Sequence, residues 1–169
     1  MQLGVKATIV GRNGERLKSA AKDLSDATGQ ECLPVAADVR KPDTLVDAVK
    51  QTIEKFGRID FVICGPCCSP LLSLPLFLPN FICSVVIKLE LERTGAAGNY
   101  LAPIENISNN AFRTVIEIDT IGTYHTIKAT LPYVRQTRGA YLHISATLHY
   151  RGTPYQACSL AHYGCYVLY

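Results

Sequence analysis

The stretch FGRIDFVICG, residues 56–65, predicts the end of a helix, a turn and a short buried strand. The run from Ile59 to Cys64 is mostly apolar, as expected of a strand that is covered on both faces of a parallel sheet. The small residues AAGN, residues 96–99, suit a loop that directly follows such a strand. The segment between them fits neither neighbour, because residues 61–87 carry no formal charge and contain four prolines. An α/β fold with an interruption is therefore expected.

Upstream of this stretch, two apolar runs alternate with two amphipathic segments. Residues 7–10 (ATIV) and 32–37 (CLPVAA) are predicted strands. A first helix is expected around residues 17–24 and a second over 42–56, where Pro42 suits the first helical turn. The apolar positions of the two helices are Leu17, Ala20, Ala21 and Leu24, then Leu45, Val46, Val49, Ile53 and Phe56.

Downstream of the interruption, the pattern predicts one long helix and a further strand. Ser108 or Asn109 can cap the helix, and residues 140–145 (AYLHIS) form the strand. Alternating strands and helices predict a parallel sheet with helices on both faces and right-handed connections. The expected apolar face of the long helix comprises Phe112, Val115, Ile116, Tyr124, Ile127, Leu131 and Val134.

Composition limits the class of protein. A chain of 169 residues with 48% apolar and 18% charged residues is large enough for one globular core and is not disordered. A net charge of +3, without a basic cluster, argues against nucleic acid as a partner. The seven cysteines and four histidines lack metal-site spacing, so we expect reduced thiols and no metal site.

The uncharged segment allows a membrane alternative. Residues 61–87 are long enough to span a bilayer as a helix. Its four prolines would break or kink such a helix, which argues against a membrane span. Translated non-coding sequence or an alternative exon within an otherwise regular fold is the preferred interpretation of the segment.

Two turns at the expected carboxyl ends of strands are candidate ligand sites, because open α/β sheets bind ligands there. Arg12 follows the first strand, Arg16 lies one helical turn later, and guanidinium groups suit a nucleotide 2′-phosphate. A solvated helix start explains the same residues equally well. Asp38 follows the second strand and could accept a hydrogen bond from an adenine amino group, or it could simply cap a helix.

Four motifs carry a family resemblance: GRN at 11–13, ADV at 37–39, FGRID at 56–60 and AAGN at 96–99. Their order and spacing are similar to those of the short-chain dehydrogenase/reductase family once residues 66–95 are removed. The resemblance covers residues 3–65 and 96–156. Within the family, the stretches at 99–103, 118–123 and 144–152 look most like the peroxisomal 2,4-dienoyl-CoA reductases.

The resemblance implies a Rossmann-like, doubly wound parallel sheet and an NADPH-dependent enzyme. We expect hydride transfer from NADPH to a 2,4-dienoyl-CoA thioester, giving a 3-enoyl-CoA in peroxisomal β-oxidation of unsaturated fatty acids, by a family-type homo-oligomer. The implied catalytic residues are Asp119 and Ser145. The implied cofactor-binding residues are Arg12, Asn13, Arg16, Asp38, Val39, Ala97 and Gly98. The implied substrate-binding residues are Arg12, Arg40, Tyr100, Ser108, Asn109 and Asn110.

The chain also departs from the family pattern. It begins at the family's second strand, so we expect one incomplete dinucleotide-binding domain over 1–169, interrupted by an insert at 66–95 and lacking the first strand and the Gly-rich loop. The strands at 7–10 and 59–64 should then each lose a backbone partner. The insert should also displace the loop at 96–99 from the nicotinamide.

The family's catalytic lysine has no counterpart where it is expected. No lysine follows Lys128, and the Tyr124–Lys128 spacing lies on a helix that precedes the Ser145 strand. Tyr155 is better placed but is followed by Ser159 where a lysine belongs. A catalytically inactive, truncated or mis-spliced product therefore remains an alternative to a working reductase.

Overall fold

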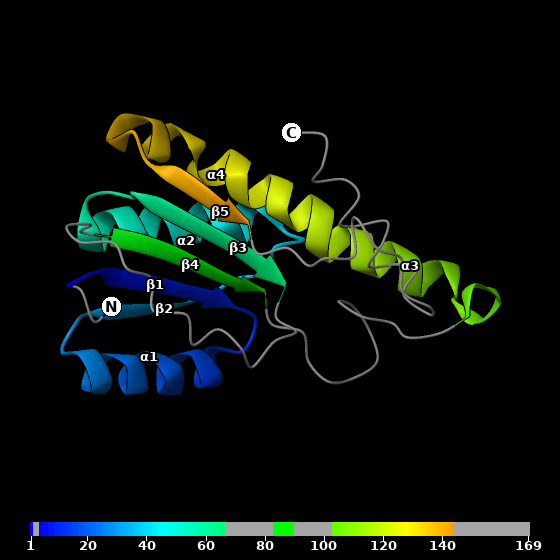
Figure 1. Cartoon of the computed structure of the whole chain (residues 1–169), viewed down its shortest axis with the longest axis horizontal. Helices are drawn as coiled ribbons and strands as arrows, with labels where there is room; N and C mark the ends of the chain where they lie inside the picture. Colours follow the sequence, from blue (N-terminus) through cyan, green and yellow to red (C-terminus); the bar gives the residue numbers. More distant parts are fainter. Residues whose placement is uncertain (2–3, 67–82, 90–102, 144–169) are drawn as a thin grey trace.

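The protein forms a five-stranded parallel sheet in the order β2-β1-β4-β3-β5. The computed structural model describes residues 1, 4–66, 83–89 and 103–143, and only the backbone of 65–66 and 83–89. Helix α1 covers one face, while α2 and α4 lie on the other (Figure 1). The elements are β1 (Lys6–Gly11), α1 (Gly14–Thr28), β2 (Cys32–Ala36), α2 (Pro42–Phe56), β3 (Phe61–Pro66), β4 (Cys83–Leu89), η1 (Ile104–Asn106), α3 (Asn109–Ile116), η2 (Glu117–Ile121), α4 (Gly122–Thr137) and β5 (Ala140–His143). This arrangement confirms the predicted Rossmann-like fold class.

The centre of the sheet is occupied by β4, which comes from the segment predicted to be an insert. Val85 of β4 is in register with Thr8 of β1 on one side and Val62 of β3 on the other. The expectation that β1 and β3 each lose a partner is therefore wrong. Ladder hydrogen bonds use backbone N–H and C=O groups, so an extended segment from elsewhere in the chain can satisfy both neighbours.

Helix ends follow the local signals in the sequence. Asn13 caps α1 by accepting a hydrogen bond from the Arg16 N–H, and Gly57 ends α2 in the left-handed conformation, with φ of 79°. Ser108, one of the two predicted caps, accepts from the Ala111 N–H at 3.1 Å. The single long helix expected after it is instead divided into α3, the π-helical turn η2 and α4.

The core has two parts, one on each face of the sheet. The larger lies between the sheet, α2 and α4 and includes Val10, Leu45 and Val134, and the smaller lies under α1 around Leu17. Some predicted core positions are wrong, since Leu24, Val46, Phe112 and Tyr124 are each at least 39% exposed. Leu24, Val46 and Tyr124 belong to apolar stripes whose edges stay in contact with solvent, and Phe112 lies on α3, which projects beyond the carboxyl ends of the strands (Figure 1).

Both ends of the uncharged segment 61–87 are strands of the sheet. Among the described residues, no helix has the length and apolar character needed to cross a bilayer. The membrane alternative required a single helix over this whole segment, but residues 61–66 and 83–87 form strands.

Candidate functional site at the carboxyl edge of the sheet

The turns after β1 and β2 lie side by side. Gly11 is in register with Ala36, and the Ala37 N–H donates to the Gly11 carbonyl at 2.8 Å. The first turn, Arg12–Glu15, leads into α1, and the second turn, Asp38–Lys41, leads into α2. Both predicted ligand-binding turns therefore meet at the carboxyl edge of the sheet.

The first turn borders open space. Arg12, Asn13, Gly14 and Glu15 line a hollow of about 430 Å³ at the N-terminus of α1. The N-terminal N–H groups of a helix favour an anion, and the exposed Arg12 and Arg16 add positive charge. Glu15 brings a negative charge to the same turn and pairs with Lys18 at 3.2 Å.

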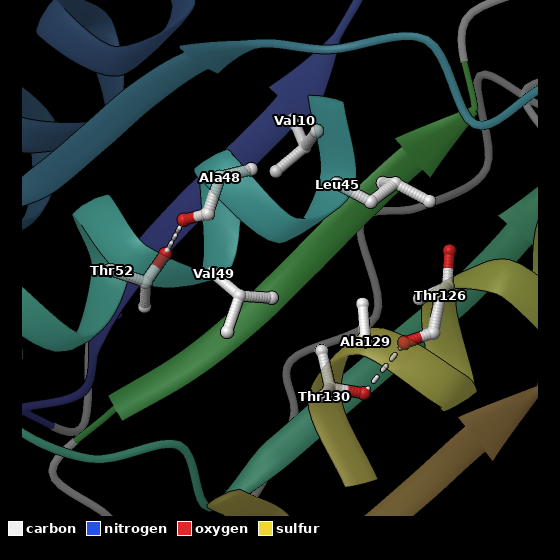
Figure 2. A pocket seen from close by; sticks show the side chains of 8 residues that line it. All are labelled: Val10, Leu45, Ala48, Val49, Thr52, Thr126, Ala129 and Thr130. Carbon is white, nitrogen blue, oxygen red and sulfur yellow. Dashed lines mark hydrogen bonds between the residues drawn. The ribbon is translucent and has the colours of Figure 1, made fainter. Parts of the chain in front are cut away.

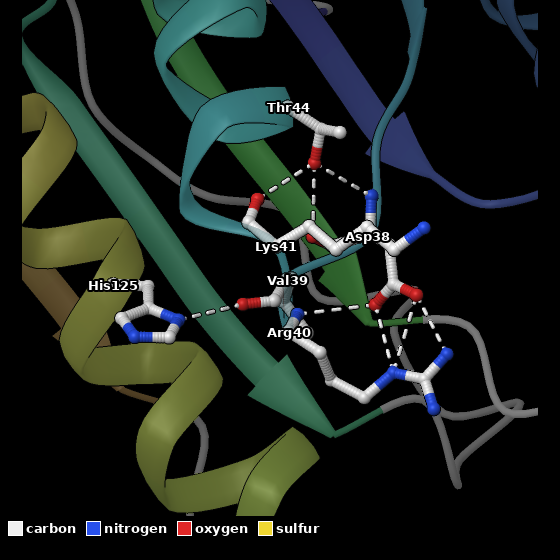
Figure 3. A network of polar contacts seen from close by, with 6 residues as sticks. All are labelled: Asp38, Val39, Arg40, Lys41, Thr44 and His125. Carbon is white, nitrogen blue, oxygen red and sulfur yellow. Dashed lines mark hydrogen bonds and ion pairs between the residues drawn. The ribbon is translucent and has the colours of Figure 1, made fainter.

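The second turn is closed by its own hydrogen bonds (Figure 3). The Asp38 carboxylate accepts from the Arg40 backbone N–H at 3.1 Å, and Arg40 Nη2 lies 2.6 Å from its Oδ2. Thr44 Oγ1 accepts from the Asp38 N–H at 3.1 Å and lies 2.9 and 2.8 Å from the carbonyl oxygens of Asp38 and Lys41. The N-cap of α2 is Lys41, so the structure does not support the helix-capping alternative for Asp38.

Electrostatics connect the two turns. Hydrogen bonding from Arg40 lowers the pKa of Asp38, and the nearby charge of Arg12 lowers it further. Hydrogen bonding to Asp38 raises the pKa of Arg40, with a smaller contribution from Glu117 of η2. The structure therefore brings together Arg12, Asp38 and Arg40 at this edge and adds an acidic neighbour, Glu117, from η2.

Helix α4 packs on the second turn through two residues that sequence reasoning missed. His125 Nδ1 lies 3.1 Å from the Val39 carbonyl oxygen, to which it donates (Figure 3). A Cβ atom on Gly122 would approach Val39 Cγ2 to 2.7 Å, so the glycine permits close contact. A glycine inside a predicted helix is a weak signal of such packing, whereas His125 had no signal in the sequence.

Asp119 lies in the π-helical turn and is 2% exposed. Burial raises its pKa to about 6. Its carbonyl oxygen accepts from Thr123 Oγ1 at 2.6 Å, which ties the turn to the start of α4. A buried acid with a pKa near neutrality can hold or release a proton, and π-helical turns are frequent at functional sites.

The remaining predicted residues are less closely associated with these turns. Ser108, Asn109 and Asn110 begin α3, which projects beyond the carboxyl ends of the strands (Figure 1). The Ser108 hydroxyl is engaged as the helix cap. Ala97, Gly98, Tyr100 and Ser145 lie outside the described residues, as do Tyr155 and Ser159.

Within residues 1, 4–66, 83–89 and 103–143, other features do not form a competing site. A cavity of about 10 Å³ lies between α2 and α4 (Figure 2), and the hydroxyls of Thr52, Thr126 and Thr130 donate to helix carbonyl groups there. Tyr124 is exposed beside Lys128, whose Nζ lies 5.8 Å from the ring centroid, on the surface of α4. No cluster of three potential metal ligands occurs in the described part of the chain.

The sequence also contains a Cys-x-x-Cys spacing at Cys64 and Cys67 that the sequence reasoning missed. Cys64 is 3% exposed on β3, and burial raises the pKa of its thiol to about 12. A reactive cysteine needs an accessible thiolate, so Cys64 has the properties of a core residue. Cys67 lies outside the described residues.

Comparison with known proteins gives consistent results. The profile of the short chain dehydrogenase family matches residues 1–70. The peroxisomal 2,4-dienoyl-CoA reductase of Danio rerio is 38% identical over 157 residues, covering 92% of this chain and 42% of that protein. Its Saccharomyces cerevisiae counterpart is also 38% identical, covering 91% of this chain and 44% of the relative. The chain thus spans a little over two fifths of the length of these curated relatives.

The fold is also that of solved enzymes. An alcohol dehydrogenase from the archaeon Thermococcus sibiricus, complexed with 5-hydroxy-NADP, superposes with a TM-score of 0.70 at 19% identity, covering 95% of this chain and 66% of that structure. The chain is thus similar to the short-chain dehydrogenase/reductase family, whose profile matches residues 1–70, and to peroxisomal 2,4-dienoyl-CoA reductases.

Proposed function

We propose that this chain belongs to an NADPH-dependent reductase that converts 2,4-dienoyl-CoA to 3-enoyl-CoA. The observation that carries the proposal is the grouping of Arg12, Asp38 and Arg40 at the carboxyl edge of β1 and β2. The similarity to 2,4-dienoyl-CoA reductases supplies the substrate class.

The residues present fit a phosphorylated nicotinamide cofactor. The N-terminus of α1 offers N–H groups beside an open hollow, with Arg12 on its rim. A guanidinium at this turn suits a 2′-phosphate, whereas an acid at the corresponding place suits an unphosphorylated ribose. NADPH would supply the hydride, and the protein would supply binding and orientation.

Each site residue has a proposed task. Arg12, Asn13 and Arg16 would hold the 2′-phosphate, with Asp38 and Val39 beside the adenine. Arg12 and Arg40 would attract the phosphates of the acyl-CoA, with Tyr100 and residues 108–110 lining its site. Asp119 would hold a proton within the site, a task suited to a pKa of about 6. Ala97 and Gly98 beside the cofactor, and Ser145 facing the substrate carbonyl, complete the proposal.

The organisation of the chain is part of the same proposal. Residues 1–169 would form one dinucleotide-binding domain with 66–95 as an insert, and the position of β4 between β1 and β3 supports a single sheet. Peroxisomal β-oxidation and a family-type homo-oligomer are proposed by similarity to the curated relatives.

Thermal unfolding with and without NADPH tests cofactor binding. Binding to the folded state should raise the melting temperature in a concentration-dependent way, and NADH should have a smaller effect at equal concentration. Arg12→Gln should reduce the difference between the melting-temperature increases that NADPH and NADH cause. No shift at millimolar NADPH would overturn the proposal, whereas binding without oxidation of NADPH by a 2,4-dienoyl-CoA would favour the inactive alternative.

A further inference from the structure

We propose that His125 is a positioning residue, which holds the second turn in the conformation that receives the adenosine part of the cofactor. The inference rests on the proposed function, because it assigns that turn to the nucleotide. His125 itself would not touch the nucleotide. It would act through the Val39 carbonyl, to which its Nδ1 donates at 3.1 Å (Figure 3).

The peptide unit between Val39 and Arg40 is held at both ends. Its carbonyl oxygen accepts from His125, and its N–H donates to Asp38 Oδ1 at 3.1 Å. Because a peptide unit is planar and rigid, one contact restrains the direction of the other. His125 therefore affects the orientation of the Asp38 carboxylate, although it lies 86 residues from Val39 in the chain.

The remaining bonds of the turn leave this peptide as its adjustable part. Thr44 holds the backbone of Asp38 and approaches the Lys41 carbonyl, and the Lys41 N–H donates to the Asp38 carbonyl oxygen at 2.8 Å. These bonds fix the two ends of the turn, and none of them is made to the peptide between Val39 and Arg40 (Figure 3). The Arg40 guanidinium binds the Asp38 carboxylate and would follow it in any rotation. His125 thus contributes the restraint on this peptide that comes from α4.

Helix α4 can supply this restraint because it approaches closely. Gly122 has no Cβ atom, and a Cβ added there would lie only 2.7 Å from Val39 Cγ2. His125 follows Gly122 by three residues, so both lie on the same face of the helix. Val39 is 8% exposed, which keeps its surroundings largely free of competing water.

The test uses two variants of His125 in the full chain. Asparagine can place a donor nitrogen where Nδ1 lies, because both atoms are bonded to Cγ, whereas leucine fills the space without a donor. The probe is adenosine 2′,5′-bisphosphate, and its dissociation constant is measured by calorimetry. His125→Leu should weaken binding about five- to tenfold, as for loss of one hydrogen bond of about 1 kcal/mol, whereas His125→Asn should stay within about twofold.

Backbone hydrogen exchange of the Arg40 amide provides a second readout that needs no nucleotide. Exchange should accelerate in His125→Leu and return toward the parent rate in His125→Asn. Unchanged affinity in a folded His125→Leu variant would overturn the inference and leave His125 with a purely structural role. If the parent chain bound no bisphosphate, the proposed function would fail, and unchanged Arg40 exchange would then separately show that His125 does not hold the turn.

Discussion

The first and second turns end neighbouring strands and yet are built differently. The first has one side-chain cap, from Asn13, and borders an open hollow. The second is bonded through Thr44, through the pair of Asp38 and Arg40, and through His125 of α4. The first turn therefore suits recruitment of an anion from solvent. The second is preorganised, so a ligand would lose less conformational freedom on binding there.

The largest expected effect concerns Asp119, in the π-helical turn that leads into the helix supporting the second turn. Because its pKa is raised to about 6 in the folded protein, the folded state retains its proton to higher pH than the unfolded state. Stability should therefore fall by about 2–3 kcal/mol as pH rises from about 4 to about 6, and then level off. Asp119→Asn should remove this fall and be the more stable protein near pH 7.

Urea unfolding across this pH range measures the effect, with Asp23→Asn on the exposed surface of α1 as the control. Parallel stability curves for the parent chain and Asp119→Asn would show that the acid is not held protonated by its environment.

The second-largest effect compares the two turns by adding one methyl group beside each of them. Gly122→Ala should destabilise the protein by about 1–2 kcal/mol, because contact with Val39 outweighs the gain in helix propensity of up to about 1 kcal/mol. Gly14→Ala in the first turn should be nearly neutral, since the nearest atom to the added Cβ lies 4.0 Å away. Thermal unfolding of both variants measures the difference. Adding Val39→Ala should restore part of the loss at Gly122, and a lack of recovery would argue against the contact.

Arginine substitutions compare how available the two turns are to phosphate. Arg12→Gln should weaken adenosine 2′,5′-bisphosphate binding about tenfold, or about 1.4 kcal/mol, and reduce its dependence on salt. Arg40→Gln should have a smaller effect, because the Arg40 guanidinium is already engaged by Asp38 and influenced by Glu117. Calorimetry at low and high salt measures both. Equal losses would contradict the distinction between an open and a closed turn.

The smallest effect is the acid response of the second turn. Arg40 lowers the pKa of Asp38, so the pair should stabilise the protein near neutral pH and lose this contribution as pH falls below about 4. The partly exposed Arg40 limits the contribution to under about 1 kcal/mol. Asp38→Asn should lower stability near pH 7 and match the parent chain in acid, as measured by urea unfolding. A constant difference at every pH would exclude the ion pair as its cause.

The local elements and the family motifs could be predicted from neighbouring residues. Strands β1 and β2, the proline at the start of α2 and the Ser108 cap of α3 are encoded by neighbouring residues, because hydrophobic period, capping and turn conformation act over a few positions. Arg12 and Asp38 were likewise predictable, since they directly follow strands whose carboxyl ends must meet at one edge of a parallel sheet.

Contacts between residues far apart in the chain became visible in the folded structure alone. The run VVI at residues 85–87 is a local strand signal that the sequence reasoning missed, but neighbouring residues do not show that this strand would pair with both β1 and β3. The bond between His125 and Val39 joins residues 86 positions apart, and the pKa of Asp119 depends on burial by the folded chain. Ladder pairing, docking and desolvation depend on distance in space, and a pattern of neighbouring residues does not specify that distance.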